Sequence, residues 1–412
     1  MTKKKSLLSV FLPILLLLSL TGCWSAQEIN NLAIINIIGV DEDNSGDVVL
    51  TVSVIRPNML FAQGSDLQGP KKESFVIHSA SGKNLFDAMG KLSKSIPEKI
   101  FLGHANVVVF GKKAAENQME TAVDFFKRQN DFRPSIELFV TKGNASDLIK
   151  QTPVLNPTLA TELHDLALRN RFSATNMVKD ISQFTNALTS DTVDPFTGVI
   201  SLSSMEHGNN NKDSSSKKAE KNTNEPKVLT LNETAVFKGA SLKGFLNDDE
   251  TKGLLWLLGD LNHENLILDC GSTNKEGTVG LNVTNSSSTM VPTFSNGQPQ
   301  MTVTIQTQAD LVEATCKNFT IDTAQMDKLN KQFEAKIKDE VLSVLYIAQQ
   351  NWETDIFGFG KAIYRKYPEK WDQLAQGWRS GGLRNMDVDI NVSATIDRYG
   401  LLKTPSKANE SR

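Results

Sequence analysis

The last third of the chain carries the pattern that most narrows its fold. Two runs of alternating apolar and polar residues, at 301–311 and 386–396, predict half-buried strands, because successive side chains of a strand point to opposite faces. Between them, apolar residues recur every three or four positions from Met326 to Trp352, which predicts an amphipathic helix of about eight turns. Aromatic residues around 371–378 predict a further short helix. Strand, long helix, short helices and closing strand make an α+β layer arrangement.

A polar stretch at 207–227 interrupts the chain at its middle. It contains no Val, Ile, Leu, Met, Phe, Trp or Tyr, so it cannot bury enough apolar surface to offset the entropy of ordering it. We interpret it as a flexible loop or linker. Acidic residues are interspersed among its lysines, which disfavours a role as a contact for anionic lipid headgroups.

Strand and helix patterns alternate on both sides of this stretch. They predict an N-terminal α+β domain at 23–200, a polar linker at 201–228, a small middle domain at 229–288, a C-terminal α+β domain with the long helix at 289–400 and a disordered tail at 401–412. We expect mixed or antiparallel sheets packed with helices. The middle domain is predicted to begin with a hairpin over 234–246 and a short helix over 250–259.

The first 22 residues are typical of a secretory leader. Three lysines precede an apolar run from Leu7 to Leu20, which is shorter than the roughly 20 residues that a membrane-spanning helix needs. The leader ends in Leu-Thr-Gly followed by Cys23, the bacterial lipoprotein pattern. In that pattern the cysteine receives a diacylglyceryl group on sulfur, and it becomes the N-acylated N-terminus after 1–22 is removed. We therefore expect lipid attachment at Cys23 and a chain anchored on the extracytoplasmic face of a membrane.

Motifs of enzymatic chemistry are absent from the sequence. It has no GxxxxGK[ST] phosphate loop, no GxGxxG after a strand, no HExxH, no CxxC and no GxSxG elbow. A net charge of −3 and a pI near 6.0 argue against nucleic-acid binding. The sequence therefore predicts a protein that is not an enzyme and holds neither a metal nor a cofactor, apart from the covalent lipid at Cys23.

Three isolated residues leave alternatives open. His104 lies beside a predicted buried strand, where a satisfied structural histidine is favoured over a ligand or a base. Cys270 and Cys316 remain after Cys23 is lipidated. Outside the membrane they could pair, but two isolated buried thiols are the favoured interpretation.

Several motifs resemble the Ger(x)C family of spore germination lipoproteins, and they occur in order over nearly the whole mature chain. They are Cys23-Trp24 leading to Gly39-Val40-Asp41, then Leu102-Gly103-His104-Ala105-Asn106, then Glu233-Thr234-Ala235-Val236-Phe237-Lys238, and finally Asp355-Ile356-Phe357-Gly358-Phe359-Gly360 with Tyr367-Pro368, Trp371 and Trp378. The lipoprotein start combined with the DxFGFG, YPxxW and W block is the most specific part. The polar stretch at 207–227 is longer than the family usually carries there.

The resemblance implies a role in assembly rather than catalysis. It implies three α+β domains of unusual topology on a lipid tether, in the C subunit of a nutrient germinant receptor in the inner spore membrane. The partners it implies are a polytopic A-type subunit and a transporter-like B-type subunit. Whether this subunit binds the nutrient directly is left open, and an extracytoplasmic solute-binding lipoprotein is the alternative function.

The glycine–aromatic block has two interpretations. In the first, Gly358 and Gly360 permit unusual backbone angles while the aromatic rings pack the last domain. In the second, the rings form an aromatic patch that docks a partner subunit, since Trp often anchors interfaces. The candidate docking residues are Phe357, Phe359, Trp371 and Trp378.

Overall fold

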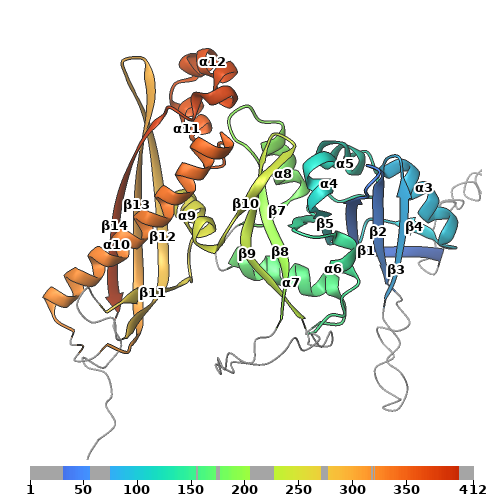
Figure 1. The fold of residues 1–412 in the computed structure, drawn as a ribbon, viewed down its shortest axis with the longest axis horizontal. Helices are drawn as coiled ribbons and strands as arrows, with labels where there is room; N and C mark the ends of the chain where they lie inside the picture. The colour runs from blue at the N-terminus through green and yellow to red at the C-terminus, as the bar shows by residue number, and fades with distance from the viewer. Residues whose placement is uncertain are drawn as a thin grey trace, which may run out of the picture.

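We describe the computed structural model over residues 31–55, 75–154, 156–172, 177–204, 227–270, 277–316, 319 and 321–398. The molecule is elongated, with two sheets side by side along its length (Figure 1). The leader, Cys23, the polar stretch at 207–226 and the tail from 399 lie outside the described residues, so the predictions made for them remain predictions.

The first sheet contains ten of the described strands. They are β1 (Leu32–Glu42), β2 (Val48–Ile55), β3 (Phe75–Gly82), β4 (Lys99–Phe101), β5 (Val107–Gly111), β6 (Glu137–Thr141), β7 (Lys179–Asp180), β8 (Phe196–Ser204), β9 (Lys227–Lys238) and β10 (Ser241–Leu246). The main order is β10-β9-β8-β6-β5-β1-β2-β3, while β4 pairs with β1 and β7 with β6. The central pairs are parallel and both flanks are antiparallel, so the sheet is mixed.

Helices cover both faces of this sheet. They are α3 (Leu85–Ser95), α4 (Lys112–Asn117), α5 (Met119–Lys127), α6 (Ala145–Ile149), α7 (Leu159–Phe172) and α8 (Ile181–Leu188). Every residue of β5 and β6 is buried. Their sequences are short and largely apolar because helices cover both sides of the sheet. A capping box formed by Asp180 and Gln183 begins α8.

The second sheet is smaller and has one long helix across it. Its described strands β11 (Asn265–Asp269), β12 (Thr278–Ser295), β13 (Gln298–Ala314) and β14 (Asp387–Arg398) lie in that order, with only β13 and β14 parallel. The predicted long helix is α10 (Thr323–Tyr346) followed by a π-helical segment, η2 (Ile347–Trp352). It packs against β14 and against α9 (Asp248–Leu258), while α11 (Phe359–Lys366), α12 (Pro368–Gly377) and the π-helical η3 (Trp378–Gly382) lie beyond its end (Figure 1).

The predicted fold class is confirmed: this is an α+β protein with mixed sheets packed with helices. The hairpin predicted over 234–246 is present as β9–β10, and the short helix predicted over 250–259 is present as α9. The range 229–288 sends β9 and β10 into the first sheet but β11 and β12 into the second. One apolar core runs continuously from one face of the first sheet to the second sheet, and another core fills the opposite face of the first sheet.

The full length of β12 was not predicted. Its middle, residues 284–289, reads Thr-Asn-Ser-Ser-Ser-Thr, which lacks apolar residues. A register shift between Val283 and Asn285 also breaks the period of two that a strand prediction relies on.

Candidate functional site: the junction of the two sheets

The four predicted docking residues lie in the interior. Phe357, Phe359, Trp371 and Trp378 are 3%, 0%, 2% and 2% exposed, respectively. The two Phe rings lie 5.0 Å apart between centroids, and the two Trp rings 5.4 Å apart. These rings therefore fill the core between α11, α12 and η3, as the packing interpretation of the block expects. Whether a partner subunit contacts the outside of this block stays a prediction.

The same block contains a buried carboxylate that organises the chain around it. Asp355 accepts hydrogen bonds from the main-chain N–H groups of Gly358 (2.8 Å), Phe359 (3.0 Å) and Gly360 (2.7 Å). The indole Nε1 of Trp378 donates a fourth bond, 3.0 Å long. The carboxylate thus satisfies the free N–H groups at the start of α11 and ties η3 to that helix start.

The glycines of this block are required by space and by backbone angle. Gly358 has a φ of 79°, in the left-handed region that favours glycine. A Cβ added at Gly360 would lie 2.7 Å from the Trp371 ring, 2.8 Å from the main-chain oxygen of Thr192 and 2.9 Å from Nε1 of Trp378. The FGFG sequence therefore lets two aromatic rings and a separate chain segment close around Asp355.

That separate segment comes from the first sheet's half of the chain. The Asp355 main-chain N–H donates to Oδ2 of Asp194 (2.9 Å), and the Asp194 N–H donates to the Asp355 main-chain oxygen (2.8 Å). The other Asp194 oxygen accepts from the Gly239 N–H at 3.1 Å. We call this contact between residues 190–196 and residues 353–360 the junction, because it fastens the strand that enters the first sheet to the segment that follows α10.

Burial changes the acidity of the Asp355 carboxyl. Removal from water and, to a smaller extent, the nearby Asp194 carboxylate raise its pKa to about 6, against the opposing effect of the donors from Gly360, Phe359 and Trp378. The cation facing this pair is Arg379, whose Nη2 is 3.9 Å from Oδ1 of Asp194 and also donates to the Ser190 main-chain oxygen. The junction therefore holds two buried acids beside one arginine.

Further contacts surround the buried Asp355 and Asp194 of the junction. Glu353 pairs with Lys238 of β9 (3.2 Å) and with Arg384 (2.8 Å). Gly244 of β10 lies against the Trp352 ring, where an added Cβ would be 2.5 Å from Cζ2. Deeper along α10, Trp256 of α9 donates its Nε1 hydrogen to Glu340 at 2.9 Å, and burial raises the pKa of Glu340.

The structure also bears on the three isolated residues named above. Cys270 and Cys316 form a disulfide, with Cα atoms 5.6 Å apart, so the favoured prediction of two isolated thiols is wrong. Cys270 directly follows β11, and Cys316 lies two residues after β13. Both strands pair with the start of β12, which brings the two cysteines together. His104 is exposed, and its ring makes a T-shaped contact with Phe101, with 5.6 Å between the ring centroids.

Sequence reasoning found Asp355 as part of a motif but missed Asp194 and Arg379. Asp194 precedes a proline and a strand, and nothing in its local pattern signals a partner 161 positions away. Within the described ranges, no group of three or more His, Cys, Asp or Glu side chains is placed to hold a metal ion. None of the described helices combines the length and apolar composition that crossing a bilayer requires.

The fold and the junction define a class of protein: a two-sheet α+β protein whose halves are joined by a buried polar contact. Two family models match it in succession, "Spore germination protein N-terminal domain" over residues 25–202 and "Spore germination B3/GerAC like, C-terminal" over residues 232–400. The chain belongs to the Ger(x)C family of spore germination proteins.

Its relatives match it almost from end to end. Spore germination protein KC of Bacillus subtilis (strain 168) is 28% identical over 417 residues, covering 98% of each chain. Spore germination protein B3 of the same organism is 24% identical over 391 residues, covering 93% of this chain and 96% of that one. A crystal structure of the GerBC protein has a TM-score of 0.50 at 18% identity, covering 87% of this chain and 96% of that chain, which shows a similar fold.

Proposed function

We propose that this chain is a lipid-anchored, non-enzymatic subunit of a nutrient germinant receptor in the inner spore membrane. It holds together a complex with a polytopic A-type and a transporter-like B-type subunit. The observation that carries the proposal is the succession of two spore germination family models over 25–202 and 232–400, together with relatives matched over nearly their full length.

The junction supports an assembly role. Asp355 is the described carboxyl whose pKa is raised to about 6, and its oxygens already accept four hydrogen bonds from the protein. A buried carboxyl that accepts hydrogen bonds in this way fastens together the chain segments that carry the donors. Two sheets joined by such a contact make one extended body (Figure 1), which suits a subunit that bridges partners.

The solute-binding alternative predicts a different architecture. That class is built from doubly wound lobes with parallel sheets and helices on both faces. Among the described strands of the second sheet, one pair is parallel and the other two are antiparallel, with α10 as the long helix across it. This arrangement favours the assembly role.

Replacement of Cys23 tests the anchor and the role together. In spores that carry Cys23→Ala, we expect the chain to be lost from the inner-membrane fraction and nutrient-triggered germination to slow at least tenfold, because the lipid is the proposed tether. Ser25→Ala, a small change two residues further on, is the matched control and should behave as the unchanged chain. Normal membrane retention and normal germination with Cys23→Ala would show that the anchor proposal is wrong.

A further inference from the structure

One end of the first sheet carries a group of cations. β4 and β5 run parallel to β1, and β6 runs parallel to β5, so these strands start at the same end of the sheet. The segment that enters β4 follows α3, and the segment that enters β6 follows α5. We call residues 94–99 and 127–133, which belong to these two segments, the basic end.

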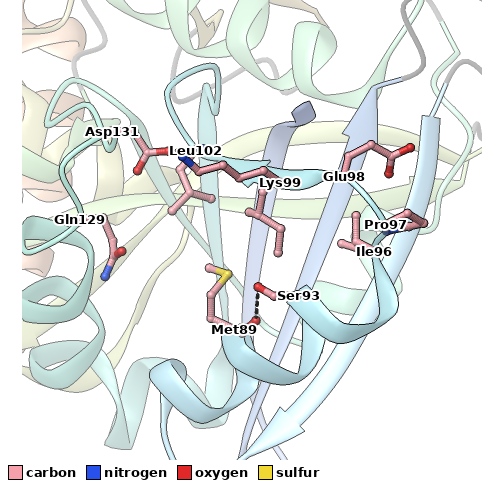
Figure 2. Close-up of a pocket in the computed structure, with 10 residues that line it drawn as sticks. Met89, Ser93, Ile96, Pro97, Glu98, Lys99, Leu102, Gln129 and Asp131 are labelled. Atoms are coloured by element: carbon pink, nitrogen blue, oxygen red, sulfur yellow. Dashed lines mark hydrogen bonds between the residues drawn. The ribbon is translucent and has the colours of Figure 1, made fainter. Parts of the chain in front are cut away.

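The two segments of the basic end lie close together in space. A pocket of about 460 Å³ is lined by Glu98 and Lys99 from one segment and by Gln129 and Asp131 from the other. Figure 2 shows Asp131 and Gln129 on one side of this pocket, Glu98 on the opposite side and Lys99 between them. The Leu102 N–H donates to Oδ2 of Asp131 at 2.9 Å, which fastens the second segment to the residue that follows β4. The two segments therefore form one continuous surface.

Four side chains of the basic end are exposed cations. They are Lys94, Lys99, Lys127 and Arg133. None of the four forms a salt bridge with a residue that the structure describes, whereas Arg128 is paired with Asp124 at 2.8 Å. The acids of the same ranges are Glu98, which is exposed, and Asp131, which is half-buried and bonded to the Leu102 N–H. This surface is therefore basic, although the whole chain has a net charge of −3.

The start of β1 lies at the same end. Leu32, the first residue of β1, is paired with Lys99 of β4. Cys23 precedes Leu32 by nine positions, and nine residues span no more than about 32 Å even when fully extended. A lipid on Cys23 would therefore keep the basic end within about 32 Å of the membrane surface.

We propose that the basic end binds the anionic headgroups of the bilayer that holds the lipid anchor, so that the chain stands on this end of its first sheet. Exposed Lys and Arg side chains form charge-assisted hydrogen bonds with phosphate oxygens. Each basic residue held near an anionic lipid surface strengthens binding about fivefold. The inference rests on the anchor in the proposed function and goes beyond it, because a lipid tether alone does not set the orientation of the chain.

Lysine labelling on vesicles tests this contact. The lipidated chain is placed on vesicles of phosphatidylcholine alone, or of equal parts phosphatidylcholine and phosphatidylglycerol, and an amine-reactive reagent labels its lysines for mass spectrometry. On the anionic vesicles Lys94, Lys99 and Lys127 are expected to react about fivefold more slowly than on the neutral ones. Salt at about 1 M should restore their rates, because it shortens the screening length to about 3 Å. Lys328 and Lys331, exposed lysines of α10, should react equally on both.

Two results would overturn the proposal. Equal rates at the basic end on the two kinds of vesicle would leave this surface for an acidic protein partner instead. The same slowing at the α10 lysines would show that the anionic vesicles attract the chain without preference for the basic end.

A double variant and a matched control assign the contact to these side chains. Lys127→Gln combined with Arg133→Gln removes two of the four charges at exposed positions, so the thermal midpoint is expected to stay unchanged. The slowing at the two remaining lysines of the basic end should fall at least threefold. Lys328→Gln combined with Lys331→Gln removes the same charge from α10 and should leave that slowing unchanged. Equal slowing in the two double variants overturns the proposal.

Flotation of the chain with vesicles separates this proposal from the anchor. A chain with a lipid on Cys23 floats with neutral as well as with anionic vesicles, whereas the basic end changes labelling only on the anionic ones. Failure to float with neutral vesicles contradicts the anchor in the proposed function. Normal flotation with unchanged labelling contradicts the headgroup contact alone.

Discussion

Two buried aspartates, one in each half of the molecule, both accept hydrogen bonds from the N–H groups at the start of a helix, but they serve different purposes. Asp41, in β1, accepts from the N–H groups of Ala145 (2.7 Å) and Ser146 (2.8 Å) at the start of α6. Asp355 does the same at the start of α11, but its main chain is also bonded to Asp194. Asp41 therefore fixes a helix inside one half, while Asp355 fixes a helix and joins the halves.

The two aspartates differ in the hydrogen-bond donors that would lose their acceptor if the carboxylate were removed. Loss of Asp41 frees two donors of a five-residue helix. Loss of Asp355 frees three N–H groups and an indole N–H, and the donors of Phe359, Gly360 and Trp378 belong to buried residues. Buried donors without acceptors are costly, so the comparison predicts unequal losses of stability.

Alanine at each aspartate should produce the largest contrast. We expect Asp355→Ala to lower the free energy of unfolding by about 4 kcal/mol. Asp41→Ala should lower it by about 2 kcal/mol, a typical upper value for a lost helix cap. Urea unfolding of both variants measures the two values. A loss at Asp41 equal to or greater than that at Asp355 would contradict the distinction between the two sites.

The pH dependence of stability should depend on Asp355. Its folded pKa of about 6 lies above the unfolded value of about 3.9, so the folded state binds more protons than the unfolded state between these values. Stability from this group is therefore fully present below about pH 4 and declines as the pH rises through about 6, by about 3 kcal/mol in total.

Asp355→Asn removes this titration and should flatten the curve of unfolding free energy against pH between 4 and 6. The buried Glu340, whose pKa is also raised, contributes a decline of the same sign in both proteins and cancels in the difference. Urea titrations at four pH values measure the difference curve. The same slope in both proteins would show that Asp355 does not titrate in this range.

Glycines beside the two aspartates sharpen the contrast further. A Cβ at Gly360 meets a main-chain oxygen and two Trp rings, none of which can move without moving the junction. A Cβ at Gly39 meets mainly the end of the Ile149 side chain, at 2.5 Å, which can rotate away. We expect Gly360→Ala to cost about 3 kcal/mol and Gly39→Ala about 1 kcal/mol, measured by thermal unfolding. Equal costs would mean that the junction adapts as readily as a single side chain.

Features of the fold that depend on neighbouring residues could be predicted from the sequence, whereas contacts between residues far apart in the sequence could not. The α10 helix, the hairpin and the closing strand were predicted because their periodicity is local. The partner of Asp355 was not, because Asp194 lies 161 positions away in the sequence. The FGFG glycines and rings did identify the correct segment, but periodicity does not tell whether such rings face the core or a partner. The Cys270–Cys316 bond was missed for the same reason as Asp194, since the register of β12 with β13 decides it.

The ion pairs of Glu353 at the edge of the junction should contribute least to the free energy of unfolding. Glu353 bonds to Lys238 and Arg384, but the three side chains are 27%, 25% and 48% exposed, so water screens their charges. Glu353→Gln keeps an oxygen acceptor and should cost about 0.5 kcal/mol, well below any change at the buried Asp355. Chemical unfolding at low and at high salt measures this cost, which should shrink as salt rises. A loss comparable with that of Asp355→Ala would place the fastening of the two halves in the outer ion pairs rather than in the buried carboxylate.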